Sequence, residues 1–216
     1  MFEIWISSMH ISDFLLIDAL LAILVIPILL FFQDRNKKLS IFRALNKTEL
    51  LEKTSINLPD KEKLLYLEKF AISQGSGIEF DSLLGEWKFQ SVWIKDYEKE
   101  DSIFSLLLRI FSAKLDLKKA ISIDDQNEFC ISISIQFGLL SIGFSGSAYL
   151  RGQRPTLTFF LNLIELKSGS RILLSKSLEE PSKNEKTFFA FIAAGESGEW
   201  LSARSQRGAF ILWLKN

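Results

Sequence analysis

The side chains that most often carry enzyme chemistry are scarce in this 216-residue sequence. The only histidine is His10, which precedes a long apolar stretch. The part expected to fold therefore has no imidazole base, no Ser–His arrangement and no histidine ligand for a metal. Glu86 and Glu165 are carboxylates without an evident partner in the sequence, so neither is assigned a catalytic role. We expect a protein that is not an enzyme and holds no cofactor, with a carboxylate or lysine enzyme as the low-ranking alternative.

Metal, phosphate and nucleic-acid sites are not indicated either. The charged run 95–101 mixes acidic residues with lysines at a spacing that matches no calcium loop, so a solvated loop is expected. The stretch 195–198 is glycine-rich but lacks the lysine of a phosphate-binding loop. Cys130 is a single cysteine within an isoleucine-rich pattern, which favours a buried, inert thiol. The 26 basic and 26 acidic residues cancel, which argues against nucleic acid as a partner.

An apolar run near the N-terminus predicts a membrane anchor. Residues 14–32 approach the roughly 20 apolar residues needed to cross a bilayer, although Asp18 and Pro27 lie within the run. Basic residues follow at 35–38, so the rest of the chain is expected on the cytoplasmic or stromal face. We assign residues 1–38 as a single N-terminal anchor; a buried or re-entrant helix is the alternative.

Residues 39–80 are expected to form a helical connector. Pro59 and Asp60 suit the first turn of a helix, and Gly75 and Gly77 are expected to end it. Leu64, Leu67 and Ala71 would share its apolar face, with Leu65 and Phe70 beside them. Its charged residues, Lys61, Glu62, Glu68 and Lys69, are interpreted as a solvated face. We expect this helix to pack on the outside or across one end of the following domain.

From residue 81 to 216 the apolar period changes from helical to two, which predicts strands. The domain is expected to be mainly β, an antiparallel barrel of about eight or nine strands with no βαβ rhythm, since closure would protect phenylalanine-rich edges. A short helix, 103–111, capped by Ser102 and apolar almost all round, is expected after the first strand, either buried across an open end or lying in a membrane surface. The expected strands are Trp87–Ile94, Ala120–Ile123, Phe129–Gln136, Leu139–Leu150, Thr156–Lys167, Arg171–Lys176, Thr187–Ala194, Trp200–Arg204 and Ala209–Leu214.

Two short motifs resemble a known family. The opening motif is Leu84-Gly85-Glu86-Trp87-Lys88-Phe89, and the closing one is Trp200-Leu201-Ser202-Ala203-Arg204 followed by Arg207-Gly208-Ala209-Phe210-Ile211-Leu212. Both are similar to motifs of the plastid-lipid-associated proteins, or fibrillins. The resemblance covers about residues 47–216 and implies a lipocalin-like domain at thylakoid or related membranes, associated with lipids, carotenoids or quinones. It implies no catalytic residue.

Two groups of residues are the candidate sites. Trp87, which follows Gly85 in the opening motif, is expected to stack under a cation from the last two strands. Arg204 is the first candidate for this cation and Arg207 the second. The contact would close the barrel. Aromatic residues of the strands are expected either to line a ligand cavity or to fill the core. Ser132, Ser134 and Gln136 would be polar groups of that cavity or the solvent face of the sheet. The aromatic set is Phe89, Phe137, Phe144, Phe160, Phe189 and Phe191, with Phe159 and Phe188 as neighbours.

The sequence predicts a non-enzymatic binder of a lipid, carotenoid or quinone at photosynthetic membranes. The alternative is an assembly or stabilising factor with a solid barrel that docks on a membrane protein complex. A continuous apolar cavity would favour the binder, and a filled interior would favour the assembly factor.

Overall fold

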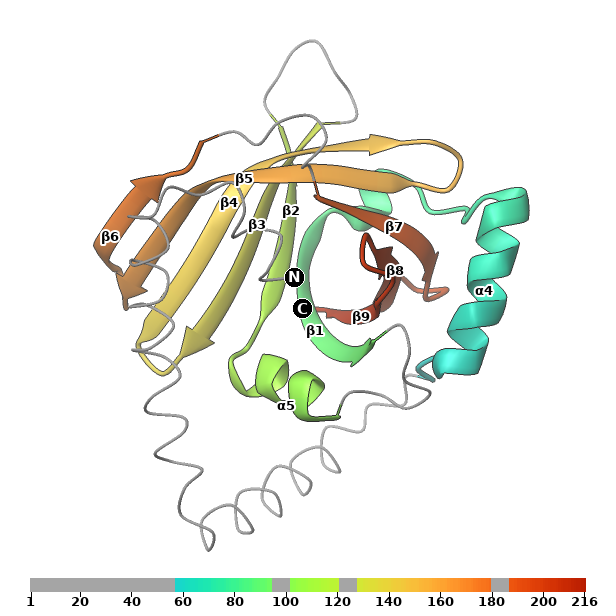
Figure 1. The fold of residues 1–216 in the computed structure, drawn as a ribbon, viewed down its shortest axis with the longest axis horizontal. Coiled ribbons are helices and arrows are strands. Elements are labelled where there is room, and N and C mark those ends of the chain that lie inside the picture. The colour runs from blue at the N-terminus through green and yellow to red at the C-terminus, as the bar shows by residue number, and fades with distance from the viewer. Residues whose placement is uncertain (1–56, 95–101, 121–127, 180–186) are drawn as a thin grey trace, which may run out of the picture. The chain divides into compact units, whose positions relative to one another are not determined.

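The residues with an apolar period of two form one antiparallel sheet of nine strands in the computed structural model of the chain (Figure 1). The structure describes residues 57–94, 102–120, 128–179 and 187–216, and all of these except Asn57 belong to one compact unit, Leu58–Asn216. The predicted anchor, 14–32, and the first domain boundary lie outside the described residues. The strands are β1 (Gly85–Trp93), β2 (Lys114–Lys119), β3 (Glu128–Phe137), β4 (Leu140–Arg151), β5 (Thr156–Ser168), β6 (Arg171–Ser177), β7 (Thr187–Ala194), β8 (Trp200–Ser205) and β9 (Phe210–Lys215).

The sheet closes on itself in a ring, which confirms the mainly β, barrel-like architecture. Its strand order is β4-β3-β2-β1-β9-β8-β7-β5, and β5 then pairs with β4. The ninth strand, β6, lies outside the ring. One edge of β5 runs along the whole of β4, whereas its other edge is shared. Residues 156–159 of β5 pair with β7, and residues 163–168 pair with β6. The ring is therefore closed by four residue pairs at only one end of β5.

The helix predicted before the strands is α4 (Lys61–Gln74), which packs against β7. Its cap is Asp60, whose Oδ1 accepts from the Lys63 N–H at 2.8 Å, and Pro59 precedes this cap rather than opening the first turn. The helix ends at Gly75, where φ is +86° and the N–H donates to the Ala71 carbonyl at 3.0 Å. Leu64 and Ala71 are buried, which confirms most of the predicted apolar face.

The second strand of the sheet was not predicted. The expected strand 120–123 lies almost wholly outside the described residues, and β2 instead spans Lys114–Lys119. Its sequence, Lys-Leu-Asp-Leu-Lys-Lys, sends Leu115 and Leu117 into the core and leaves charged residues on the other face. Only two apolar residues alternate with charged ones there, so the alternating run is too short to identify a strand from the sequence.

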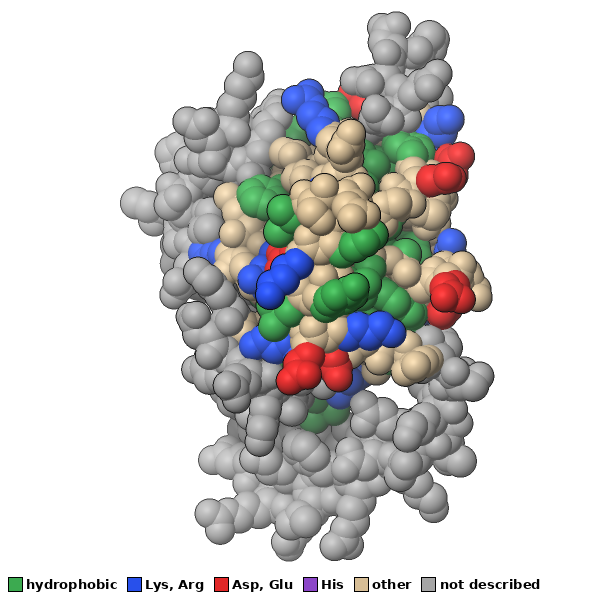
Figure 2. All heavy atoms as spheres, turned by 90° about the vertical axis from the view of Figure 1, so that its right-hand side faces the viewer, with side chains coloured by type: hydrophobic (Ala, Val, Ile, Leu, Met, Phe, Trp, Pro, Cys, Tyr) green, Lys and Arg blue, Asp and Glu red, His purple; other side chains and the backbone are tan. Residues whose placement is uncertain are grey.

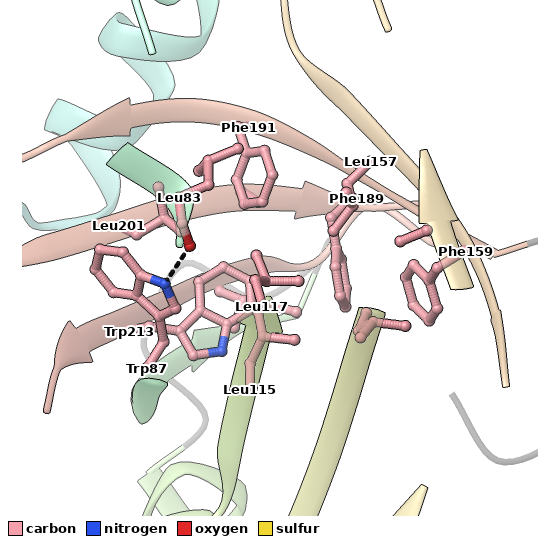
Figure 3. Packing of buried hydrophobic residues seen from close by; sticks show 14 of the residues in the cluster. Leu83, Trp87, Leu115, Leu117, Leu157, Phe159, Phe189, Phe191, Leu201 and Trp213 are labelled. Carbon is pink, nitrogen blue, oxygen red and sulfur yellow. Dashed lines mark hydrogen bonds between the residues drawn. The ribbon is translucent and has the colours of Figure 1, made fainter. Parts of the chain in front are cut away.

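One half of the ring interior is filled with side chains. The cluster around Trp87, Trp213, Phe189 and Phe191 is almost fully buried (Figure 3). The chain entering β1 crosses this end through the short 3-10 helix η1 (Asp81–Leu83). From this crossing segment, Phe80 stacks on Phe129 with ring centroids 4.1 Å apart. The segment therefore plugs the end at which β1 begins.

The short helix α5 (Ser102–Ile110) packs against β1, as expected for a helix near the other end of the ring. Ser105 is fully buried and its Oγ accepts from the Val92 N–H at 2.9 Å. Arg109 Nη1 donates to the Gln90 carbonyl at 3.0 Å. The helix is not buried all round, because Phe104 is 43% exposed. Neither α4 nor α5 is long and apolar enough to cross a membrane, and the same holds for every helix among the described residues.

Gly146 provides a test of this strand pairing. It lies at a β-bulge opposite β5, where an added Cβ would press on the Phe160 carbonyl oxygen and lie 2.9 Å from the Leu161 Cα. Because the obstacle is backbone, we expect Gly146→Ala to lower the free energy of unfolding by about 1–3 kcal/mol, measured by denaturant titration.

Gly143, three residues away in the same strand, is the matched control. An added Cβ there meets nothing within 4 Å, so Gly143→Ala should be neutral or slightly stabilising. Equal effects of the two substitutions would contradict the register of β4 on β5.

Candidate functional site

The inner face of the sheet continues beyond the filled half. Along β3, Phe129 and Ile131 are each only 1% exposed, whereas Ile133 and Ile135 on the same face are half-buried. The register places Phe144 of β4 directly opposite Ile133, and it is half-buried too. A run of inward apolar residues that begins as core therefore becomes partly accessible, although Ile133 and Ile135 still pack against the core.

The cause of this change is the switch of partner along β5. Where β5 leaves β7, its pairing with β6 places Leu166 opposite Leu174, and both are half-buried. Ile142 and Ile164 stay buried between these residues and β3. We call this apolar surface the open half of the ring: Ile133, Ile135, Phe144 and Leu166 of the ring strands, together with Leu174 of the adjoining strand β6.

The predicted aromatic set is divided between different places. Phe89, Phe189 and Phe191 belong to the filled core. The Phe89 and Phe189 rings pack 5.4 and 5.6 Å from the Trp213 ring, and Phe159 packs 5.0 Å from Phe189.

Three further members lie away from the filled core. Phe144 lies in the open half, and Phe137 lies at its outer end, 46% exposed. Phe160 lies between two inward residues of β5, so it is on the outer face, as is Phe188 opposite Thr158. The polar residues Ser132, Ser134 and Gln136 alternate with the inward isoleucines and therefore also lie on the outer face.

Cys130 shares that outer face and is exposed, so its predicted burial is wrong. The isoleucine-rich pattern does not by itself place Cys130 in the core. Only one face of β3 is apolar and inward, and Cys130 lies on the other.

The predicted closing pair has a different cation. Trp87 is buried and its indole N–H donates to the Leu83 carbonyl at 2.8 Å (Figure 3). The cation over its ring is Lys215, with Nζ 5.2 Å from the centroid. Lys215 is directly opposite Trp87 because β9 runs antiparallel to β1. Gly85, with φ of +120°, opens the strand in a conformation that favours glycine.

Neither predicted arginine takes that place. Arg204 lies on the outer face of β8, with Cζ 4.0 Å above the Phe210 ring. Arg207 is exposed in the turn before β9, at the opposite end of that strand from Lys215. Six residues of strand span about 20 Å, which is too far for a contact with Trp87.

Arg204 instead helps to attach α4. Glu68 of α4 was predicted to be solvated, but its side chain is only 13% exposed. Its Oε1 lies 2.9 Å from Nη2 of Arg154 and 3.5 Å from Nε of Arg204. One carboxylate thus holds two guanidinium groups, one from the turn before β5 and one from β8.

Several other charged groups of the domain also have structural partners. Glu86 accepts from Lys114 at 3.0 Å, and Glu165 pairs with Lys167 at 2.9 Å. The hydrogen bond to Asp116 raises the pKa of Lys118, so this lysine stays a cation at neutral pH and is a poor general base. The described residues contain no group of three side chains suited to a metal ion.

A hollow of about 510 Å³ lies at the plugged end of the ring. No local pattern indicates this hollow, because it forms between the segment before β1 and the β4–β5 turn. It is open and of mixed polarity, unlike the apolar open half. Its lining residues are Gly77, Ile78, Phe80, Leu150, Arg151, Gly152, Gln153 and Pro155.

Comparisons of the chain with family models, with curated proteins and with solved structures found no match.

The Glu68 contacts predict a specific loss of stability. Glu68→Gln removes the charge between two partly buried arginines, so we expect a decrease of about 1–3 kcal/mol in the free energy of unfolding. The control is Glu79→Gln, at an exposed position of the same region, which should stay within about 0.5 kcal/mol of the parent protein. Parent-like stability of Glu68→Gln in thermal and denaturant unfolding would show that this contact does not hold α4 in place.

Proposed function

We propose that this protein is a non-enzymatic, membrane-associated binder of a hydrophobic small molecule, and that the molecule binds in the open half of the ring. The observation that carries the proposal is the half-buried state of inward apolar residues such as Ile133, Ile135 and Phe144. Inward apolar surface of a curved sheet that stays partly accessible favours an apolar ligand.

The chemistry of the open half suggests the class of ligand. Its side chains are aliphatic and aromatic, and the serines of β3 lie on the other face. Binding would therefore depend on apolar area and shape rather than on hydrogen bonds. A lipid, a carotenoid or a quinone fits this requirement, and the filled half would serve as a rigid floor.

The fibrillin resemblance and the membrane location belong to the same proposal. A ring with Trp87 under a cation, preceded by a packed helix, supports a lipocalin-like domain. Residues 14–32 would anchor the chain, with the ring on the cytoplasmic or stromal face of a membrane such as the thylakoid.

A second candidate is an assembly or stabilising factor that docks on a membrane protein complex. It is favoured by the other half of the ring, where Trp87, Trp213, Phe189 and Phe191 leave the interior filled. Under this alternative the open half would receive a side chain or helix of a partner.

Ligand binding is tested by placing the same charge on either face of β3. Ile135→Glu places a charge on the open half, so we expect co-purified lipid or pigment, detected by native mass spectrometry and solvent extraction, to be lost. Ser134→Glu places the same charge at the adjacent residue, which lies on the outer face of β3, and should leave the bound molecule in place.

Both variants should fold, because residues 134 and 135 are each half-buried. Circular dichroism and the unfolding midpoint check this. If protein purified from its own host carries no hydrophobic molecule, or if both variants keep it equally, the open half is not the binding site.

The anchor is tested by deletion. Removing residues 1–35 should move the protein from the membrane fraction to the soluble fraction, because the apolar run supplies the stable attachment. An unchanged distribution after carbonate washing would contradict the anchor.

A further inference from the structure

We infer that the end of the ring beside α5 carries a second membrane contact, formed by the tips of two hairpins that insert into the bilayer interface. This inference rests on the proposed membrane association. The tips belong to β3–β4 and β5–β6, and the Gly169 N–H joins them by donating to the Leu139 carbonyl at 2.7 Å. The contact surface, which we call the rim, consists of Phe137, Leu139, Ile172 and Leu173.

The rim exposes large apolar side chains at the ends of two hairpins. Phe137 is 46%, Leu139 77%, Ile172 57% and Leu173 56% exposed. Leu139 lies in the β3–β4 turn, where Gly, Pro, Asn, Asp or Ser are usual, and the other three lie at the adjoining ends of β3 and β6. Four exposed apolar side chains on adjacent tips indicate a contact surface. Phe111, at the end of α5, packs edge-on against Phe137 with centroids 5.7 Å apart, and this extends the rim to the helix.

The charges beside the rim suit a lipid headgroup layer. Arg171 is exposed and directly precedes Ile172. Lys167 pairs with Ile172 across the hairpin, and its ammonium lies 2.9 Å from Glu165. A cation next to protruding apolar residues matches the boundary between phosphate groups and acyl chains.

Continuity with the open half favours lipid over a protein partner. Phe137 follows Ile133 and Ile135 on the same face of β3, so the apolar surface of the rim runs into the ring. A rim resting in the bilayer would let a hydrophobic molecule pass between the membrane and the open half without crossing water.

The exposed apolar residues of α4 offer a matched comparison. Leu65, Tyr66, Phe70 and Ile72 are also exposed, but on the α4 side of the ring. Figure 2 shows that face, where hydrophobic side chains are interspersed with lysine, arginine and acidic side chains. Such a face is ordinary for a solvated helix, so α4 should stay in water.

The test uses the full chain on vesicles of phosphatidylcholine and phosphatidylglycerol with brominated acyl chains. In a Cys130→Ser background, an environment-sensitive fluorophore is attached after Leu139→Cys, Ile172→Cys or, as control, Ile72→Cys. We expect the labels at 139 and 172 to be quenched several-fold more than the label at 72, whatever residues 14–32 contribute to vesicle binding.

The inference is overturned if the vesicle-bound protein keeps the labels at 139 and 172 accessible to aqueous iodide, if the label at 72 is quenched instead, or if the full chain does not bind vesicles. A second variant, Leu139→Ser with Ile172→Ser, should abolish the bilayer contact of the rim while keeping the hydrophobic molecule bound. If the parent protein carries no hydrophobic molecule, this result counts against the proposed function and not against the membrane contact of the rim.

Discussion

The architecture depends on how β5 divides one of its edges. Four of its residues pair with β7 and close the ring, and the next part of the strand pairs with β6. A strand edge can satisfy only one neighbour at each position, so every residue given to β6 is unavailable for closing the ring. The filled half and the open half are both consequences of this division.

The two halves also differ in what stabilises them. In the filled half, buried aromatic rings from sequence-distant strands pack together, so these strands are held by apolar burial and dispersion. The Trp87 indole N–H is satisfied locally by the Leu83 carbonyl, four residues earlier in the chain. In the open half, Ile133 and Ile135 still pack against the core, but they are only partly buried, and the strands are joined by continuous backbone pairing. A protein built in this way has a stable floor next to a surface that can bind apolar molecules.

Much of this fold was readable from the sequence because it depends on local patterns. The alternation in Phe129–Gln136 and Thr187–Ala194 predicted β3 and β7 closely, and Asp60 and Gly75 marked the ends of the helix. The parity of β8 also carried information: Leu201 and Ala203 are inward, so Arg204 had to face outward, away from Trp87. Lys215 takes its place because antiparallel pairing brings the end of the last strand to the start of the first.

Long-range pairing was not readable in the same way. Nothing local in Arg171–Ser177 shows that β6 lies outside the ring, and the buried role of Glu68 depends on two arginines far away in the chain. The open half follows from that pairing.

The most direct measurement is the relaxation of isoleucine methyl groups in the presence of a soluble nitroxide that cannot enter a filled core. Ile131, Ile133 and Ile135 lie on one face of one strand, so they differ only in the half of the ring they occupy. The account predicts strong broadening at Ile133 and Ile135 and little at Ile131. Equal protection of all three methyl groups would show that the ring is filled from end to end, and would contradict the open half.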